Sequence, residues 1–246
     1  MLKLLSFILS SFFYLVFGFL LLFFHFIQWI CLKFITSDTQ KKSVDLLCFF
    51  ITKCFKIINA KISFQNIESI PEKKIKIFVL NHQSLFEIPP LIWYLRKFNP
   101  KFISKQELGK GIPSISFHLR NGGSVLINRK NKTESLERIK KFCNEIKLNN
   151  SSIIIFPEGT RSKSGVPRKF KTTGLRIIME EIPDSIIIPI TINGSYKLNQ
   201  WNGFPLPLNI QISFNILEQI VVNDKKINNI IVSTEKKIND FIMLSN

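Results

Sequence analysis

The sequence predicts an α/β protein: a sandwich of a mostly parallel mixed sheet covered by helices, preceded by an N-terminal membrane-associated helical hairpin. Three observations lead to this fold. Short apolar runs alternate with longer amphipathic segments along most of the chain, as strands alternate with helices in such proteins. Polar residues follow directly after several of the apolar runs. The chain also begins with an uncharged segment that is long enough to enter a membrane.

The N-terminal segment, residues 4–32, contains no Asp, Glu, Lys or Arg. As a helix it would be about 43 Å long, and a membrane span needs about 20 residues. No small-x-small cleavage site follows, so we expect an anchor and not a cleaved signal peptide. The anchor either crosses the membrane with a tilt or enters it and bends near Gly18. Because Lys33, Lys41 and Lys42 follow the segment while Lys3 alone precedes it, a cytoplasmic C-terminal side is favoured.

Residues 44–62 predict a second apolar helix, with Lys53, Lys56 and Lys61 spaced along it. We interpret it as an amphipathic helix that lies in the membrane interface. The alternative is a core helix of the soluble part of the protein. The predicted organisation is therefore a membrane anchor over residues 1–60, made of these two helices, and an α/β domain over residues 61–246.

The α/β domain is predicted element by element from its periodicity and its turn residues. Loop 193–209 is expected either to touch lipid or to pack on the protein. His25 and His118 are expected to be structural. The predicted strands are 61–64, 74–80, 102–104, 124–127, 153–156, 186–192 and 210–214. The predicted helices are one from Ser84 to Lys97, a broken one up to Arg120, and those over 133–147, 172–181 and 224–244.

The chain has 246 residues and a formal net charge of +17. Nucleic acid, a membrane surface or an anionic substrate would each suit this charge. No nucleic-acid motif is recognisable, so we expect no nucleic-acid partner. The four cysteines form no Cys-x-x-Cys pair, and we expect neither a disulfide framework nor a zinc site.

Asn81 and His82 follow the strand that ends at Leu80, and Ser84 with Glu87 has the pattern of a capping box that starts a helix. Ligands of open α/β sheets bind at this end of the strands. Across a turn, the Glu87 carboxylate would accept the Nδ1 proton of His82 and leave Nε2 free as a base. The alternative is a structural histidine. A covalent serine route is disfavoured because the chain has no Gly-x-Ser-x-Gly elbow.

A second polar loop, residues 156–162 with the sequence Phe-Pro-Glu-Gly-Thr-Arg-Ser, follows the strand at 153–156. Two loops at two strand ends of one sheet can converge on one site. Residues 161–176 then hold six basic side chains and no acidic one. We interpret this run as an anion site, in preference to a solvated loop.

Together these motifs resemble the glycerolipid acyltransferase family. The resemblance rests on Asn-His-x-Ser-x-x-Glu at 81–87 and Phe-Pro-Glu-Gly-Thr-Arg-Ser at 156–162. Weaker matches lie in the family's order at 105–108, 123–129 and 188–190, so the resemblance covers about residues 60–200. Many members carry Asp where this chain has Glu87; a bacterial subset uses Glu.

The resemblance implies transfer of a fatty acyl group from an acyl thioester to the sn-2 hydroxyl of 1-acyl-sn-glycerol 3-phosphate, which gives phosphatidic acid. His82 would be the general base and Glu87 its orienting partner. No cofactor or metal is implied beyond the co-substrate, acyl-CoA or acyl carrier protein. The residues implied to bind the substrate phosphate are Lys105, Arg129, Glu158, Gly159, Thr160 and Arg161.

The expected partners are membrane lipid, the lysophospholipid and the acyl donor, at the inner membrane with the catalytic domain on the cytoplasmic face. Two other functions remain open at this point. One is the same chemistry on glycerol 3-phosphate or another lysolipid. The other is a non-enzymatic, basic, membrane-binding protein.

Overall fold

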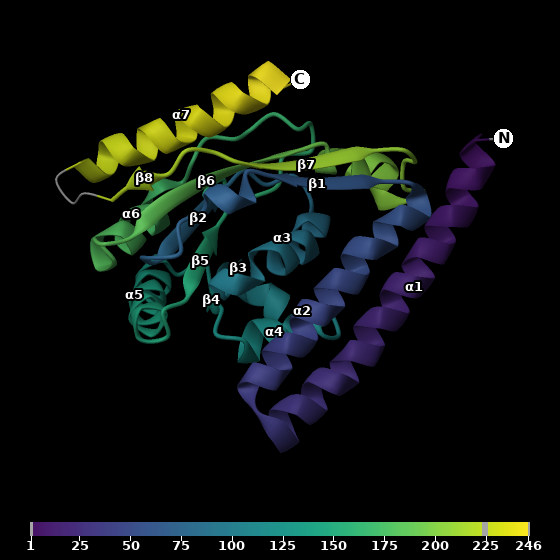
Figure 1. Ribbon diagram of the computed structural model, residues 1–246, viewed down its shortest axis with the longest axis horizontal. Helices are drawn as coiled ribbons and strands as arrows, with labels where there is room; N and C mark the ends of the chain where they lie inside the picture. Colours follow the sequence, from purple (N-terminus) through teal and green to yellow (C-terminus); the bar gives the residue numbers. More distant parts are fainter. Residues whose placement is uncertain (1, 223–225, 246) are drawn as a thin grey trace.

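A computed structural model describes residues 2–222 and 226–245 of the chain. Within these residues one sheet has the strand order β1-β7-β6-β2-β5-β3-β4, and β8 pairs with β6 beside this path (Figure 1). The strands are β1 (Lys61–Gln65), β2 (Lys76–Leu80), β3 (Pro100–Lys105), β4 (Val125–Ile127), β5 (Ser152–Ile155), β6 (Ile186–Asn193), β7 (Gln211–Ile216) and β8 (Ile220–Val221). Strand β6 runs antiparallel to β7 and to β8, and the other neighbours are parallel. The predicted mostly parallel mixed sheet is therefore confirmed; β8 was not predicted.

The helices cover both faces of this sheet. The α-helices are α1 (Leu2–Ile30), α2 (Ser37–Cys54), α3 (Ile88–Leu95), α4 (Ile115–Asn121), α5 (Lys132–Leu148), α6 (Thr172–Glu181) and α7 (Ile227–Ser245). A π-helical turn, η1 (Cys31–Ile35), joins α1 to α2. The 3₁₀ turns are η2 (Phe55–Ile58), η3 (Ile67–Ser69), η4 (Leu85–Glu87), η5 (Arg96–Phe98), η6 (Gln106–Gly109) and η7 (Ser195–Gly203). The predicted start of the last helix at Asp224 lies outside the described residues.

The central strands are apolar along their whole length because helices bury both of their faces. All of β2, β5 and nearly all of β6 are buried. Along β2 the side chains alternate between two hydrophobic clusters: Phe78 and Leu80 pack with residues of α1, α2 and α3, whereas Ile77 and Val79 pack with residues of α5, α6 and α7. Figure 1 shows the resulting layers, with α7 on one face and the α1–α2 pair on the other.

The N-terminal hairpin differs from its prediction in the second helix. Helix α2 begins at Ser37 and ends at Cys54, and residues 61 and 62 already belong to β1, so the predicted helix 44–62 is wrong at both ends. The side chain of Thr36 caps α2 by accepting a hydrogen bond from the Thr39 amide. Lys41 and Lys42 consequently lie inside α2 and not in a linker. Helix α1 runs through Gly18 without a break.

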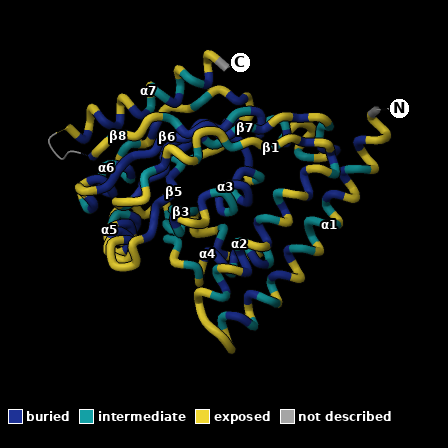
Figure 2. The backbone as a smooth tube through the Cα atoms, viewed as in Figure 1, coloured by how far each residue is buried: buried dark blue, intermediate teal, exposed yellow. Residues whose placement is uncertain are grey.

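Many residues of helix α1 are exposed, as the yellow parts of its tube in Figure 2 show, and large apolar side chains are among them. Its inner side packs Phe13, Leu21 and Phe24 into the hydrophobic core. In the described part of the chain, one helix, Lys3–Ile35, is long and apolar enough to cross a membrane. The outward large apolar side chains include Leu4, Phe7, Ile8, Phe12, Leu15, Phe19, Leu22, Phe23, Phe26 and Trp29.

Helix α2 has a buried apolar side, as a core helix has, and also exposed apolar residues, as an interfacial helix has. Val44, Leu47 and Ile51 are buried in the core, as in a core helix, whereas Leu46 and Phe50 are exposed beside α1. A continuous cluster of buried residues joins α1 and α2 to the sheet. The division into an anchor over 1–60 and a domain over 61–246 stays a prediction.

Candidate active site

The two polar loops predicted to converge do so because their strands are neighbours. Strand β2 pairs with β5 in parallel, with Val79 opposite Ile155, so both loops leave the same edge of the sheet. Two hydrogen bonds join them: the Ser162 amide donates to the His82 carbonyl over 2.7 Å, and the His82 amide donates to Glu158 Oε1 over 3.1 Å. The backbone of His82 is therefore held from both sides by residues of the second loop.

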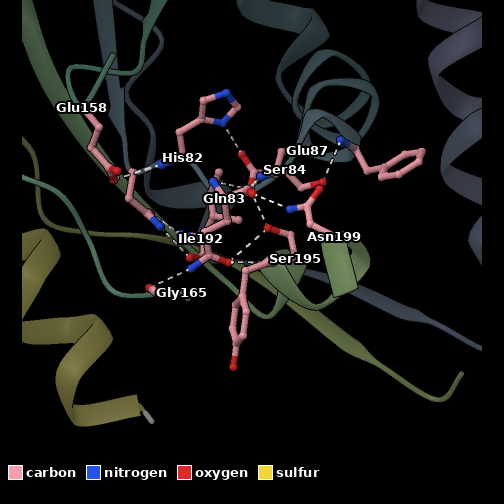
Figure 3. Close-up of polar contacts among 12 residues, drawn as sticks. His82, Gln83, Ser84, Glu87, Glu158, Gly165, Ile192, Ser195 and Asn199 are labelled. Atoms are coloured by element: carbon pink, nitrogen blue, oxygen red, sulfur yellow. Dashed lines mark hydrogen bonds and ion pairs between the residues drawn. The ribbon is translucent and has the colours of Figure 1, made fainter. Parts of the chain in front are cut away.

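The side chains of His82 and Glu87 meet across the turn (Figure 3). Nδ1 of His82 lies 2.9 Å from Oε2 of Glu87. The Gln83 and Ser84 amides donate to Glu87 Oε1 over 2.8 and 2.6 Å, and the Ser84 side chain completes the capping box. Because the Glu87 carboxylate can only accept a hydrogen bond, the neutral His82 ring carries its proton on Nδ1. Nε2 is then the basic nitrogen.

The imidazole of His82 is partly accessible while its partner is not. Its side chain is 15% exposed, and the Glu87 side chain is 0% exposed. One ring face stacks on Phe156, with 4.3 Å between the ring centres. Asn81 next to it is structural: its amide exchanges two hydrogen bonds with the backbone of Ile192 in β6. The ring is thus oriented by Glu87 and Phe156, and it stays partly open to a reactant.

Glu158 is buried beneath the loops and supports the backbone of His82. It is buried, and among the described residues its Oε2 has no hydrogen-bond partner. Burial raises the pKa of Glu158 to about 7, and the charge of Glu87 adds to this, against the opposing effect of the His82 and Arg168 amides. Near neutral pH the carboxyl is therefore partly protonated. It repels an anion in the site less than a full carboxylate would.

Gly159 lies next to two basic side chains, those of Arg129 and Lys171. Its φ of +70° is a left-handed conformation that favours glycine. The Arg129 guanidinium donates to the Gly159 carbonyl. A Cβ on Gly159 would lie 3.2 Å from the Lys171 side chain and 3.3 Å from that of Arg129. Two cations therefore border this turn, one from the loop after β4 and one from the basic run 161–176.

The remaining predicted phosphate ligands, Lys105, Thr160 and Arg161, lie at the same edge of the sheet. Lys105 ends β3, which pairs in parallel with β5 and β4. Thr160 and Arg161 are exposed, and neither side chain makes a hydrogen bond or ion pair among the described residues. Arg161 directly precedes Ser162, whose amide bonds to His82. The phosphate-binding role of all six residues stays a prediction.

Three residues of the site were not predicted from the sequence. Gln83 is buried, and its side chain donates to the Gly165 carbonyl over 3.2 Å. Ser195 and Asn199 come from the segment after β6 and bond to Glu87 and Gln83. The signal that pointed toward them was the apolar strand 186–192, which ends at a polar Asn-Gly-Ser sequence like the two predicted loops.

The other two histidines lie elsewhere and are structural, as predicted. His25 Nδ1 accepts the Ser114 amide over 3.1 Å and its ring packs on Phe117. His118 is buried in α4, and burial together with the charges of Lys101 and Lys41 lowers its pKa to about 4. In the part of the chain that the structure describes, no three His, Cys, Asp or Glu side chains are grouped to hold a metal ion.

Known proteins resemble this chain in sequence and in fold. It is 37% identical over 134 residues to the 1-acyl-sn-glycerol-3-phosphate acyltransferase of Helicobacter pylori, a match that covers 53% of each chain. It is 30% identical over 154 residues to a chloroplast 1-acyl-sn-glycerol-3-phosphate acyltransferase of Arabidopsis thaliana, covering 61% of this chain and 42% of the relative. The chain thus spans about half the length of the curated relatives it matches.

The fold has a counterpart in a crystal structure of the 1-acyl-sn-glycerophosphate acyltransferase of Thermotoga maritima. The TM-score is 0.75 at 23% sequence identity, and the likeness covers 99% of this chain and 97% of that one. The sequence profile described as Acyltransferase matches residues 61–193, more than half of the chain. That range includes His82, Glu87, Arg129 and the loop 156–162. The chain therefore belongs to the acyltransferase family.

Proposed function

We propose that the protein transfers a fatty acyl group from an acyl thioester to the sn-2 hydroxyl of 1-acyl-sn-glycerol 3-phosphate, giving phosphatidic acid. The observation that carries this proposal is the His82–Glu87 pair, with Nδ1 engaged by the carboxylate and Nε2 free at a strand-end site bordered by cations. The similar proteins from Helicobacter pylori and Arabidopsis thaliana are 1-acyl-sn-glycerol-3-phosphate acyltransferases, which supports the choice of acceptor.

In the proposed reaction His82 Nε2 takes the proton of the acceptor hydroxyl as its oxygen attacks the thioester carbonyl. The new C–O bond forms, the C–S bond breaks, and the imidazolium returns the proton to the leaving thiolate. Glu87 stabilises the imidazolium and holds the ring. One positioned base contributes about 10²–10⁴-fold to such a transfer. The reaction as written needs no metal or cofactor, and either acyl-CoA or acyl carrier protein supplies the thioester.

The acceptor phosphate would bind along the loops after β3, β4 and β5. Arg129 and Arg161 suit a phosphomonoester because a guanidinium donates two parallel hydrogen bonds, and Lys105 adds a point charge. Glu158, Gly159 and Thr160 shape the turn between them. Arg161 is the most informative of these residues because its exposed side chain has no partner in the described structure to lose.

We expect Arg161→Ala to raise the Michaelis constant for the phosphate-bearing acceptor by about tenfold to a hundredfold, since a charge-assisted hydrogen bond contributes about 1.5–3 kcal/mol. The constant for the thioester should change little. Arg161→Lys should recover only part of the loss because it lacks the planar fork. Steady-state kinetics with each substrate varied in turn measure this. Lys73→Ala, which removes an exposed cation before the opposite end of β2, is the matched control. Equal effects on both substrates would contradict phosphate binding.

The same proposal places the protein at the inner membrane with the α/β domain on the cytoplasmic side. Membrane attachment is supported by the apolar outer surface of α1 and by the exposed Leu46 and Phe50 of α2. The cytoplasmic side is favoured by Lys33, Lys41 and Lys42 after the apolar segment. We expect the protein to stay in the membrane fraction after carbonate or high-salt washing, because salt screens charges without weakening apolar attachment. Protease should reach the C-terminus from the cytoplasmic side alone. Release by salt would refute an apolar anchor.

The decisive experiment uses the purified chain in detergent with labelled acyl thioesters. The acceptors offered are 1-acyl-sn-glycerol 3-phosphate, glycerol 3-phosphate and other lysolipids. Labelled phosphatidic acid as the main product supports the proposal. A different acylated product assigns the same chemistry to another acceptor. Absence of transfer to every acceptor from either donor would leave a non-enzymatic membrane-binding protein as the better description.

A further inference from the structure

Ser195 is fully buried against the carboxylate that orients the candidate base. Its Oγ lies 2.5 Å from Glu87 Oε1 and 3.1 Å from Gln83 Oε1. Figure 3 draws Ser195 beside these two residues. A hydroxyl has one proton to donate, and the shorter contact with a charged acceptor takes it. Gln83 Oε1 has another donor in the Tyr196 amide at 3.3 Å. The geometry therefore assigns the Ser195 proton to Glu87.

The backbone around Ser195 is built to hold this position. Gly194 has a φ of +87°, and a Cβ there would lie 2.0 Å from the Gln211 carbonyl oxygen, so only glycine fits the turn after β6. Four residues after Ser195, the side-chain amide of Asn199 donates to the backbone carbonyl of Gln83 over 2.8 Å. These contacts join η7 to the turn that carries His82. Ser195 thus reaches Glu87 from a segment more than 100 residues away in sequence.

The far end of the same segment is fastened to helix α1. The Tyr14 hydroxyl donates to the Gly203 carbonyl over 2.7 Å. Ser10 accepts the Leu206 amide over 2.7 Å, and Ser6 donates to the Leu206 carbonyl over 2.6 Å. Trp201 and Phe204, on either side of Gly203, are exposed, and Phe204 packs on Phe7 of α1. The predicted loop 193–209 is therefore packed at both ends, and its position does not depend on Ser195 alone.

Three donors converge on one oxygen of Glu87, which decides where the other oxygen points. Oε1 accepts the Gln83 and Ser84 amides and the Ser195 hydroxyl. Oε2 then faces Nδ1 of His82. The two amides belong to the turn that carries Glu87 itself, so Ser195 is the donor that fixes the carboxylate against the rest of the sheet.

We propose that Ser195 is a positioning residue: its hydroxyl holds the Glu87 carboxylate so that His82 keeps its proton on Nδ1 and presents Nε2 as the base. This inference rests on the proposed function for its catalytic consequence. The tautomer of His82, however, is a property of the protein without substrate. It can be measured whether or not the protein transfers acyl groups.

The test compares Ser195→Ala with Ser185→Ala. Ser185 is also fully buried, lies just before the other end of β6 and donates to a backbone carbonyl over 2.6 Å, so it matches the loss of a buried hydroxyl. The chain has three histidines, and ¹⁵N-histidine spectra in detergent resolve their tautomers. We expect His82 to be protonated on Nδ1 in the unmodified protein and in Ser185→Ala, and to become a mixture of tautomers in Ser195→Ala.

Kinetics give the second measurement. Ser195→Ala should lower kcat by about tenfold or more while both Michaelis constants stay within about twofold, because no substrate contact is lost. Ser185→Ala should leave both unchanged. In a Glu87→Gln background the Ser195→Ala change should add little, since both act on one carboxylate. If Ser195→Ala does not fold, Ser195→Cys replaces it, because a thiol of similar size is a weak donor.

The outcomes separate this inference from the proposed function. An unaltered His82 tautomer in a folded Ser195 variant would overturn it, and so would an unaltered kcat. If Ser195→Ala alters the His82 tautomer but the unmodified protein transfers no acyl group, the positioning role is supported and the proposed function is rejected. An altered tautomer with a lower kcat would support both.

Discussion

Replacing His82 by Ala is expected to lower acyl transfer by two or more decades while the protein stays folded and membrane-bound. A positioned base contributes about 10²–10⁴-fold to such a transfer. The hydrogen bonds of the His82 backbone to Ser162 and Glu158 do not involve the imidazole and survive the change. Glu87 keeps three donors on Oε1.

The loss is measured as the rate of labelled product formation, with thermal unfolding and membrane fractionation of the same preparation. His25→Ala is the matched control, because it removes a histidine that packs on Phe117 outside the site. Near-full activity of a folded His82→Ala protein would return His82 to a structural role.

The convergence of the two polar loops, residues 81–87 and 156–162, was predictable because it depends on local patterns. Each loop follows a short apolar strand, and parallel strands bring their carboxyl ends to one edge of the sheet. Ser84 and Glu87 form the capping box that their spacing indicates. His82 and Glu87 are five residues apart, so their spacing was enough to predict that the two side chains meet.

What the sequence did not predict depends on contacts between distant segments. Ser195 and Asn199 reach the site across more than 100 residues, and nothing in the polar sequence after β6 indicates which donor meets which acceptor. The start of α2 was missed because residues 37–43 are polar. Gln40 and Ser43 are nevertheless buried there. Polar residues on a buried face give no apolar periodicity, so the packing of α2 on α1 and α3 could not be predicted from this stretch.

The acidic partner of His82 gives the second large expected effect. Glu87→Gln keeps the size of the side chain and removes its charge, so it no longer stabilises the imidazolium. If the amide oxygen takes the place of Oε1 and keeps the three donors there, the amide nitrogen faces His82 Nδ1. That contact favours the tautomer with the proton on Nε2, which cannot act as the base. We expect transfer to fall by about a hundredfold or more.

Glu87→Asp is the sharper comparison. It keeps the charge, shortens the side chain by one methylene and matches the residue that many members of the family carry. An Asp cannot reach all of the donors that Glu87 Oε1 now accepts, so some loss is expected. A carboxylate still stabilises the imidazolium, however, and Asp should retain at least about tenfold more activity than Gln.

Rates for both single variants and for His82→Ala combined with Glu87→Gln test whether Glu87 acts through His82. The double change should cost hardly more than His82→Ala, because both residues serve one proton transfer. Fully additive losses, or equal activity of the Asp and Gln variants, would show that Glu87 only supports the fold.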